Sequence, residues 1–422
     1  MSNSCSRNVW DRWKMSRGLS YGRLSSALLR ALFLAIGVSA VLVSTSAFPA
    51  ETLRPEVAKP LQTARALYQA QRYKDALASV AQAEAVPGKS QYESDLIAQM
   101  GGAAAVAAGD LAVAARDYGF LIQSGRQPVA EQQKMMAALT SLAYQQGNYA
   151  QAVQWGQRYQ SAGAGDPHMK TLLAQSYYMA GNAGAAEKLL RPAVDAELRA
   201  GRAPDADALK LLESCYQKQD DNAGYTAMLE QLVKYYPTPA YWGELLNRLQ
   251  ADPKFGGRFE LDVYRLKQAT NNLGSASDYI EMTQLAILAG HGAEALSVVN
   301  QGFNSGVLGK GADAGRGERL RNLATKPAAQ PQPAATAGNG AALVETGFNE
   351  ALSGKNQQGI ALIETGLAKG GLADPNEARL HLGIAYYLAG QKGKALNAFD
   401  AVAGNGAAAT LARLWKLALR ST

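Results

Sequence analysis

Two short segments contain the glycine and lysine combination found in nucleotide-binding loops. Residues 88–90 read Gly-Lys-Ser, and Gly309-Lys310 is a second candidate. A phosphate-binding loop also needs a glycine five residues before the one that precedes the lysine, because the loop backbone must wrap the phosphates. That place is taken by Ala83 in the first segment and by Asn304 in the second. Neither segment therefore fits, and we expect no nucleotide cofactor.

The histidines are the next residues that could do chemistry. The chain has three, His168, His291 and His381. None has another histidine or a cysteine at the spacing of a metal-binding pair, so we expect no metal site. We interpret His168 as the start of a helix, His291 as part of a turn and His381 as a residue within a helix.

An acidic pair and a thiol complete the candidates for catalysis. We interpret Asp220-Asp221 as a turn whose carboxylates bond to a helix boundary, not as an acid–base pair. Cys215 lies beside Tyr216 on a predicted helix, where a buried, inert thiol is expected. No serine lies in a nucleophile-elbow sequence. The sequence therefore predicts a protein that is not an enzyme, unless side chains distant in sequence come together.

The elements that carry these residues are predicted to be paired helices, as residues 140–159 illustrate. Apolar residues at helical spacing, Leu142 and Ala143 among them, end at a turn containing Gly147. A second helical segment follows, with the small residue Ala152 on its apolar face. Two helices joined by so short a turn must lie antiparallel, and small residues let them approach. Such a pair cannot bury its apolar faces alone, so it must be one unit of a stack.

The unit recurs when each copy is aligned on its turn and on the residue five places later. Those residues are Ala76, Ala114, Ala152, Ala186, Tyr225, Ala295, Gly359 and Ala395, with successive spacings of 38, 38, 34, 39, 70, 64 and 36. The spacing of 70 corresponds to two repeat lengths, so residues 241–271 are predicted to hold a degenerate copy. The spacing of 64 contains one repeat and an insertion. The alternative, an irregular alanine-rich helical protein, would not keep this register.

A period near 34 with two helices per unit resembles the tetratricopeptide repeat (TPR) family. That family has a small residue at position 8, Tyr at 11, Gly at 15, Ala at 20 and an aromatic residue at 24. The last copy carries all five types, as Gly383, Tyr386, Gly390, Ala395 and Phe399. The resemblance extends roughly over residues 60–414, and the chain is also similar to exported TPR proteins of proteobacteria that have no assigned activity.

The resemblance implies an all-α fold, a right-handed α-solenoid of about nine antiparallel helix pairs. Residues 48–325 would hold repeats 1–7, with the sixth degenerate. Residues 326–340 contain three prolines and no apolar period, which is typical of a linker. Residues 341–422 would hold repeats 8 and 9 and a final helix that caps the stack.

The first 47 residues have the pattern of a signal peptide. They contain six basic residues and one acidic residue, and the last of these charges is followed by an apolar run thirteen residues long, at 31–43. Small residues at 45–47 favour cleavage after Ala47, with cleavage after Ala50 the weaker option because Phe48 would take a small-residue position. This pattern predicts export to the periplasm; an uncleaved membrane anchor is the alternative. No later apolar run approaches the length of a membrane span.

The charge of the chain invites a nucleic-acid interpretation, which its distribution does not support. The formal net charge is +7 and the pI about 9.2, but most of the basic excess lies in the predicted leader. No block of Lys and Arg with interleaved aromatic residues remains, so we expect no nucleic-acid partner.

The TPR resemblance implies that the first helix of each repeat lines a concave groove, through positions 9 and 12 among others. Position 12 is often tyrosine, and the groove would be aromatic, polar and close to neutral, suited to a peptide or protein partner. The alternative is that these tyrosines only cover joints between repeats. The predicted groove residues are Arg65, Tyr68, Tyr144, Gln175, Tyr178, Gln284 and Tyr387.

Two functions are compatible with this pattern. The first is a non-enzymatic periplasmic scaffold that binds a peptide or protein partner in its groove. The second is a structural or assembly component of an envelope machine, such as one for polysaccharide export, where exported TPR proteins also occur.

Overall fold

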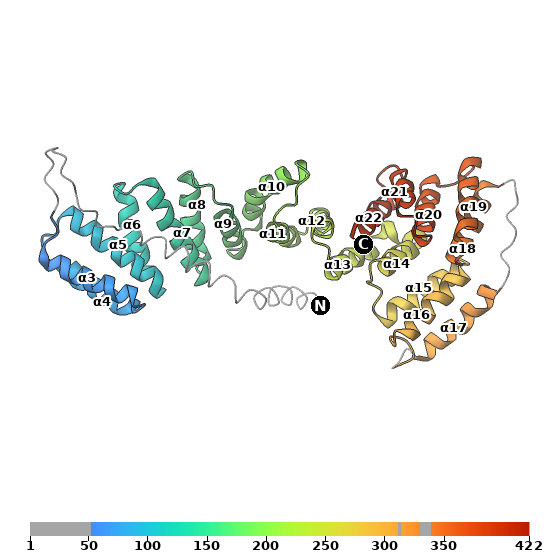
Figure 1. Ribbon diagram of the computed structural model, residues 1–422, viewed down its shortest axis with the longest axis horizontal. Coiled ribbons are helices and arrows are strands. Elements are labelled where there is room, and N and C mark those ends of the chain that lie inside the picture. Colours follow the sequence, from blue (N-terminus) through green and yellow to red (C-terminus); the bar gives the residue numbers. More distant parts are fainter. Residues whose placement is uncertain (1–51, 311–313, 330–338, 422) are drawn as a thin grey trace. The chain divides into compact units, whose positions relative to one another are not determined.

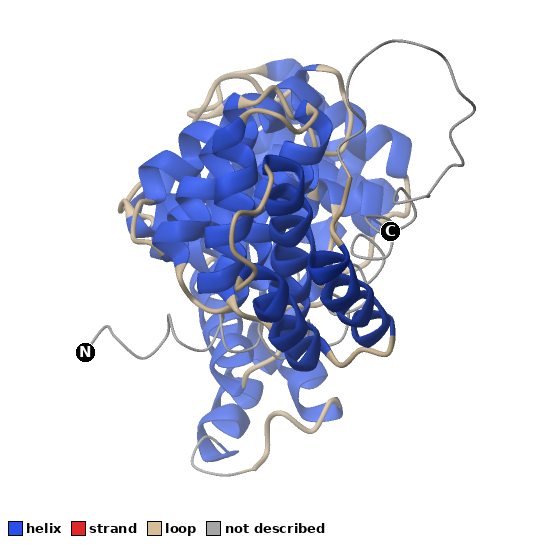
Figure 2. Ribbon diagram, turned by 90° about the vertical axis from the view of Figure 1, so that its left-hand side faces the viewer, coloured by secondary structure: helices blue, strands red, loops and turns tan. Residues whose placement is uncertain are grey.

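The computed structural model describes residues 52–310, 314–329 and 339–421, and the regular structure in these ranges is entirely helical (Figures 1 and 2). The all-α prediction is therefore confirmed, while the handedness of the solenoid and the number of pairs stay predictions. The predicted leader, residues 1–47, lies outside the described residues. None of the described helices is long and apolar enough to cross a membrane.

The chain divides into two compact units, Met1–Asn182 and Ala183–Thr422, which are described separately below. This division falls between the two helices of the fourth predicted repeat. The helices before and after the predicted linker, residues 326–340, both belong to the second unit.

Unit 1 is a series of helix pairs in which each helix packs on the next. The first helices of successive pairs, α3, α5, α7 and α9, also contact one another, so the pairs stack side by side (Figure 1). Keeping the predicted numbering, repeats 1, 2 and 3 are α3–α4, α5–α6 and α7–α8. The helices are α3 (Pro55–Gln69), α4 (Tyr73–Glu84), α5 (Gln91–Ala108), α6 (Leu111–Ser124), α7 (Val129–Gln145), α8 (Tyr149–Ser161) and α9 (Pro167–Met179).

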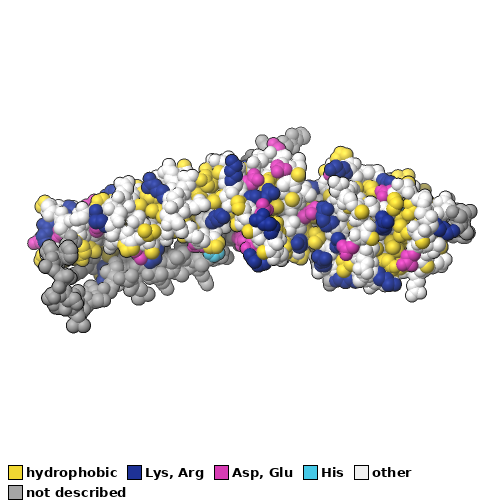
Figure 3. Space-filling view, turned by 90° about the horizontal axis from the view of Figure 1, so that it is seen from above, with side chains coloured by type: hydrophobic (Ala, Val, Ile, Leu, Met, Phe, Trp, Pro, Cys, Tyr) yellow, Lys and Arg dark blue, Asp and Glu magenta, His cyan; other side chains and the backbone are white. Residues whose placement is uncertain are grey.

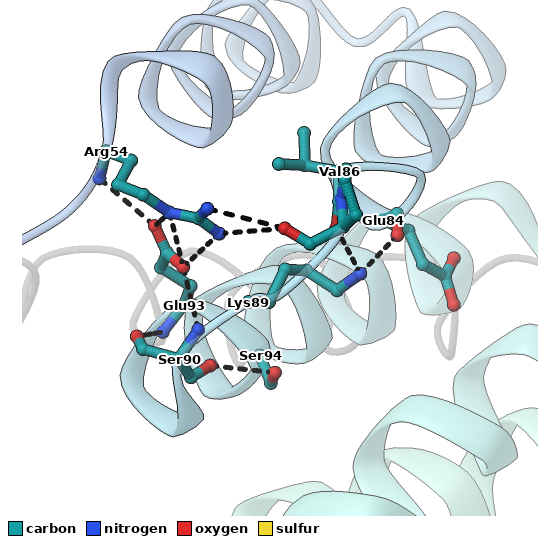
Figure 4. Close-up of polar contacts among 8 residues, drawn as sticks. Arg54, Glu84, Val86, Lys89, Ser90, Glu93 and Ser94 are labelled. Carbon is teal, nitrogen blue, oxygen red and sulfur yellow. Dashed lines mark hydrogen bonds and ion pairs between the residues drawn. The ribbon is translucent and has the colours of Figure 1, made fainter.

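The helices of unit 1 begin and end where the local sequence demands. Ser90 and Glu93 form a capping box at the start of α5: Ser90 Oγ accepts from the Glu93 N–H at 3.1 Å, and the Glu93 carboxylate accepts from the Ser90 N–H at 2.8 Å. Arg54, just before α3, donates to both carboxylate oxygens of Glu93 at 2.8 Å (Figure 4). These bonds, that of Arg54 foremost, lower the pKa of Glu93 to about 2. They tie the start of repeat 1 to repeat 2.

The small residues used to align the repeats lie where paired helices touch. Ala76, Ala114 and Ala152 are completely buried in unit 1, as are Ala186, Ala295 and Ala395 in unit 2. In repeat 3, a Cβ atom on Gly156 would come within 2.9 Å of Leu173, so this glycine also permits close helix packing. The exception is Tyr225, which is buried although it is large.

Unit 2 contains α10, which is the second helix of repeat 4, then repeats 5 to 9 and two further helices, α17 and α22. Repeats 6 and 7 are α13–α14 and α15–α16, with the 3₁₀ turns η1 (Pro253–Phe255) and η2 (Gly257–Phe259) before α14, and repeats 8 and 9 are α18–α19 and α20–α21. The helices are α10 (Ala183–Arg199), α11 (Ala206–Lys218), α12 (Asn222–Tyr235), α13 (Pro239–Ala251), α14 (Glu260–Ala269), α15 (Ala276–Leu288), α16 (Gly292–Asn304), α17 (Ala314–Ala329), α18 (Gly340–Leu352), α19 (Asn356–Lys369), α20 (Pro375–Leu388), α21 (Lys392–Asp400) and α22 (Ala407–Ser421).

The predicted linker needs a correction. Its first four residues are helical, because α17 runs to Ala329. Leu320 and Ala324 are buried, and α17 packs on α15 and α16, which stabilises this helix beyond what its sequence suggests. Gly340, the last residue of the predicted linker, begins α18. Residues 330–338 lie outside the described residues.

The last helices of unit 2 fold back onto its earlier ones. α22 packs on α21 and α20, as a cap should, but also on α12 and α14. Arg413 of α22 pairs with Glu230 of α12 at 2.8 Å, and Arg258 of η2 pairs with Glu377 of α20. An open stack would leave these elements apart, so unit 2 is closed on itself in a way that the repeat pattern does not indicate.

Candidate functional site

The predicted groove residues are divided between the two units. Arg65, Tyr68, Tyr144, Gln175 and Tyr178 are in unit 1, and Gln284 and Tyr387 are in unit 2. Each unit must therefore be judged as a binding surface by itself.

Two of the unit 1 residues are buried within the repeats. Gln175 and Tyr178 of α9 are 5% and 7% exposed. A side chain so fully covered offers little surface to a partner. For Tyr178 the structure favours the alternative that the tyrosine covers a joint.

Tyr68 and Tyr144 are half-buried, and each packs edge-on against another tyrosine. The ring centroids of Tyr68 and Tyr73 are 5.2 Å apart, and those of Tyr144 and Tyr149 are 5.5 Å apart. In each pair the first ring belongs to the last turn of one helix and the second ring to the first residue of the next. The tight turn within repeats 1 and 3 brings them together. Arg65, also half-buried, lies one turn before Tyr68.

A cavity of about 680 Å³ opens along the same edge of unit 1, where the paired helices turn. We call it the turn cleft. It is lined by Lys74 and Leu77 of α4, by residues 108–112 around the turn of repeat 2, and by Gln146, Asn148 and Gln151 around the turn of repeat 3. Lys74 follows Tyr73 directly in the chain, and Asn148 precedes Tyr149. One tyrosine of each pair is therefore next in sequence to a residue of the cleft wall.

The polar walls of the turn cleft are held in place by internal hydrogen bonds. Gln146 donates from Nε2 to the carbonyl oxygen of Gly109 at 2.5 Å, which joins neighbouring turns. Asn148 donates to Gln151 Oε1 at 2.9 Å, and Asp110 Oδ1 accepts from the N–H of Val113 at 3.0 Å as the cap of α6. Three side-chain amides line the cleft, and each has both donors and acceptors. Lys74 and Asp110 are the one cation and the one anion of the wall, so the lining has no net charge and suits an uncharged polar chain more than a strongly charged ligand.

In unit 2 the predicted groove residues contact the chain's own extra helices. Gln284 of α15 accepts a hydrogen bond from Arg316 of α17 at 2.9 Å. The Tyr387 ring of α20 lies 5.0 Å from the Trp415 ring of α22, centroid to centroid. A smaller cavity of about 390 Å³ lies at the turns of repeats 8 and 9, lined by residues 354–358, Ala389 and Gln391. It occupies the same place in the repeat as the turn cleft and is again rich in amides.

The residues that raised catalytic possibilities have structural roles. Ser90 caps α5, and Lys89 Nζ donates to the carbonyl oxygens of Glu84 and Val86 at 2.5 and 2.7 Å, so residues 88–90 form a helix boundary (Figure 4). Asp221 caps α12 by accepting from the N–H of Gly224 at 2.9 Å, which confirms the helix-boundary interpretation.

The thiol and the metal-ligand candidates also lack the features of a reactive site. Cys215 is completely buried, and burial raises its pKa to about 12, as expected for an inert thiol. Over the part of the chain that the structure describes, no group of three or more His, Cys, Asp and Glu residues could hold a metal ion. On the face of the molecule seen in Figure 3, Lys and Arg are interspersed with Asp and Glu. The expected absence of a nucleic-acid partner stays a prediction.

The sequence did not reveal a cluster of buried charges in unit 2. Asp262 and Arg265 of α14 meet Glu294 of α16 and His381 of α20. These residues lie on three helices far apart in the sequence. The only available signal was an Asp and an Arg three residues apart, which is a common pattern on helix surfaces.

Comparison with known proteins identifies the repeats in part of the chain. A sequence profile described as tetratricopeptide repeat matches residues 100–167 and residues 353–410. The first match extends from within α5 to the start of α9, and the second from the turn before α19 into α22. A search of curated proteins gave no match.

Several solved structures are similar to the chain at low identity. A structure of Naa15/Naa10 bound to HypK-THB has 16% identity and a TM-score of 0.33, with 84% of this chain and 58% of that chain covered. The Cut9–Hcn1 hetero-tetramer of APC/C has 10% identity and a TM-score of 0.24, with 86% and 76% covered. Yeast Tom70 has 12% identity and a TM-score of 0.20, with 86% and 94% covered. The chain thus spans little more than half the length of the first of these, and no conclusion below rests on them.

Proposed function

Because the chain contains tetratricopeptide repeats at residues 100–167 and 353–410, we propose that it is a non-enzymatic scaffold that binds a peptide or protein partner. Stacked repeats of this kind present extended surfaces that proteins use for binding one another. We further propose that the scaffold works in the periplasm, as the basic, apolar and small-residue pattern of residues 1–47 suggests.

The turn cleft is the observation that supports this function most directly. Its amide side chains can pair with both the N–H and the C=O groups of an extended peptide. The pairs Tyr68–Tyr73 and Tyr144–Tyr149, each adjacent in sequence to the cleft wall, offer apolar area next to hydroxyl groups, a combination enriched at protein interfaces. The proposed site therefore keeps Tyr68 and Tyr144 from the predicted groove and omits the buried Gln175 and Tyr178. It lies at the turns rather than along the middle of the first helices.

Filling the turn cleft tests the proposal. Ala112 is an exposed residue of the cleft wall and the second residue of α6. Ala112→Trp should block the cleft with little effect on folding. Ala130 is also exposed and is the second residue of α7, but it does not line the cleft, so Ala130→Trp is the matched control.

Each variant would be tagged, expressed in the native host and compared with the wild type by quantitative affinity purification. We expect proteins that co-purify with the wild type and with Ala130→Trp to fall on the order of tenfold with Ala112→Trp, a loss of about 1.4 kcal/mol. If Ala112→Trp has a normal unfolding midpoint and still recovers all the co-purifying proteins, the binding surface lies elsewhere. Crosslinking in the cell envelope adds a second readout. One stable multiprotein neighbourhood would favour the alternative role in an envelope machine.

A further inference from the structure

Helix α14 is unusual because charged residues occupy its buried core-facing positions. Every residue from 261 to 267 is buried, including Asp262 at 1%, Arg265 at 6% and Lys267 at 4% exposed. Ions are rarely covered to this extent unless they are paired, because removing them from water is costly. Lys267 meets Asp278 at 2.6 Å within repeats 6 and 7. The other two charged residues connect to more distant parts of unit 2.

Arg265 is at the centre of a buried ionic network. Its Nε and Nη2 atoms donate to the two carboxylate oxygens of Glu294 at 2.8 and 2.7 Å, and its Nη1 donates to Asp262 Oδ1 at 2.7 Å. The second oxygen of Asp262 lies 3.3 Å from Nε2 of His381 in α20. Repeats 6 and 7 are thereby bonded to repeat 9.

A ring cluster around Phe348 of α18 completes the connection. His381 stacks on Phe348 with centroids 4.0 Å apart and planes within 3°, and Arg265 lies 4.7 Å from the same ring. His291, at the start of α16, meets Phe348 edge-on at 5.8 Å, and its Nδ1 bonds to the side-chain oxygen of Asn349. Both histidines therefore lie where the helices that precede residues 330–338 contact the helices that follow them.

We propose that this cluster, Asp262, Arg265, His291, Glu294, Asn349 and His381 around Phe348, is an acid-sensitive lock that holds repeats 8 and 9 closed against repeats 6 and 7. Asp262–His381 and Arg265–Phe348 join non-consecutive repeats, and His291–Asn349 joins repeat 7 to repeat 8. Opening these contacts would separate the two pairs of repeats without breaking either pair. Two ion pairs elsewhere in unit 2, Arg258–Glu377 and Arg413–Glu230, involve half-exposed arginines and contribute little stability alone.

His291 is the residue expected to sense acid. Burial and the neighbouring Arg265 lower the pKa of His291, outweighing the opposite effects of Glu294 on α16 and of Asn349 and Glu345 on α18. A proton on His291 would place a second cation beside Arg265 in the closed lock. Asp262 is not the sensor: burial alone would raise its pKa, but His381 and Arg265 together hold it well below its ordinary value.

The direction of the pH effect follows from proton linkage. Above the ordinary histidine pKa of about 6.5, His291 is neutral whether the lock is open or closed, so pH has no effect through it. Below that value the open form binds a proton that the closed form excludes. The closed form therefore loses stability as the pH falls, and the open fraction rises by up to about tenfold per pH unit for this one proton.

Hydrogen exchange of the full chain tests the lock, with rates corrected for the intrinsic effect of pH. Between pH 7.5 and pH 5.5, we expect peptides from α14, α18 and α20 to lose protection, while α5 to α8 of unit 1 keep theirs. Equal changes in both sets of helices, or no change in α14, α18 and α20, would overturn the proposal.

Two variants remove the acid response by different means. His291→Gln cannot titrate, and Asn349→Asp places a carboxylate against His291, which lets the closed form accept the proton. In either protein the selective loss of protection at pH 5.5 should disappear, and Asn349→Asp keeps the test valid if His291→Gln does not fold. His168→Gln, which removes the exposed histidine of α9, is the control and should behave as the wild type. A wild-type response in a folded His291→Gln or Asn349→Asp protein would show that His291 is not the sensor.

Discussion

Gly383 of α20 faces Phe399 of α21 so closely that a methyl group in place of its hydrogen would overlap the phenyl ring. These two residues occupy positions 8 and 24 of the last repeat. The sequence pattern assigned a small residue to the first position and an aromatic residue to the second. The structure shows that each residue type depends on the other.

Gly383→Ala should therefore destabilise unit 2. The ring of Phe399 is completely packed, so the added methyl group must displace it, and we expect a loss of about 1–3 kcal/mol in the free energy of unfolding. Urea unfolding followed by circular dichroism measures it. Gly393→Ala is the control, because nothing lies within 4 Å of a Cβ atom there and α21 should gain about 0.5–1 kcal/mol. A Gly383→Ala protein as stable as this control would contradict the packing described.

Ala152→Leu tests the closest approach of α7 and α8. Ala152 is completely buried, and the larger side chain should cost about 1–3 kcal/mol of stability by overpacking. Ala150 lies on the exposed face of the same helix, so Ala150→Leu should leave the unfolding midpoint nearly unchanged. If the two variants unfold alike, the register assigned to repeat 3 is wrong.

Tyr144 and Tyr178 should respond differently to truncation, although both occupy position 12. Tyr178 is buried, so Tyr178→Ala should lose about 3–5 kcal/mol, as other large buried aromatic residues do. Tyr144 is half-buried, so Tyr144→Ala should lose less stability and should reduce partner recovery. Melting curves and affinity purification of the two single variants separate the effects. If Tyr178→Ala has normal stability, Tyr178 is again a candidate for the binding surface.

Cys215 should be unreactive until unit 2 unfolds. Its thiol is completely buried and its pKa is raised to about 12, so little reactive thiolate exists at pH 8 and reagents cannot reach it. Peptide mass spectrometry after treatment with iodoacetamide should show no label on Cys215 in native protein and full labelling in urea. Glutathione in the same solution verifies that the reagent is active. Rapid labelling of native protein would show that α11 opens readily.

Cleavage of the leader is expected after Ala47. N-terminal sequencing of the protein purified from its native host should then begin at Phe48. A small residue three places before the cleavage point is required by the processing enzyme, so Thr45→Arg should cause full-length protein to accumulate. Recovery of intact, membrane-associated leader from wild-type cells would instead support the anchor alternative.

The sequence was informative wherever structure depends on residues close in the chain. Turns such as Gly109-Asp110 and Gly147-Asn148 end one helix and cap the next through atoms within a few residues. The alanines five residues after the start of each turn, such as Ala114 and Ala152, are buried because each repeat brings the same pair of helix faces together. Helix pairs, their register and the inert Cys215 could therefore be predicted without tertiary information.

The sequence was less informative where the same repeat position has different neighbours. Tyr144 packs edge-on against Tyr149, Tyr178 of α9 is buried, and Tyr387 lies against Trp415 of α22. The repeat pattern assigns all three to one groove. Only the elements packed around each tyrosine decide whether it is available to a partner.

The sequence by itself determined that this chain forms paired helices with a TPR register and no local catalytic motif, because capping, turn formation and small-residue packing act over a few residues. The tertiary structure alone decided that unit 2 closes on itself. Asp262 and His381 lie on helices separated by more than a hundred residues, and their pairing depends on how α14 and α20 meet. Their burial, and hence the lock, follows from the packing of whole helices, which no periodic pattern in the chain specifies.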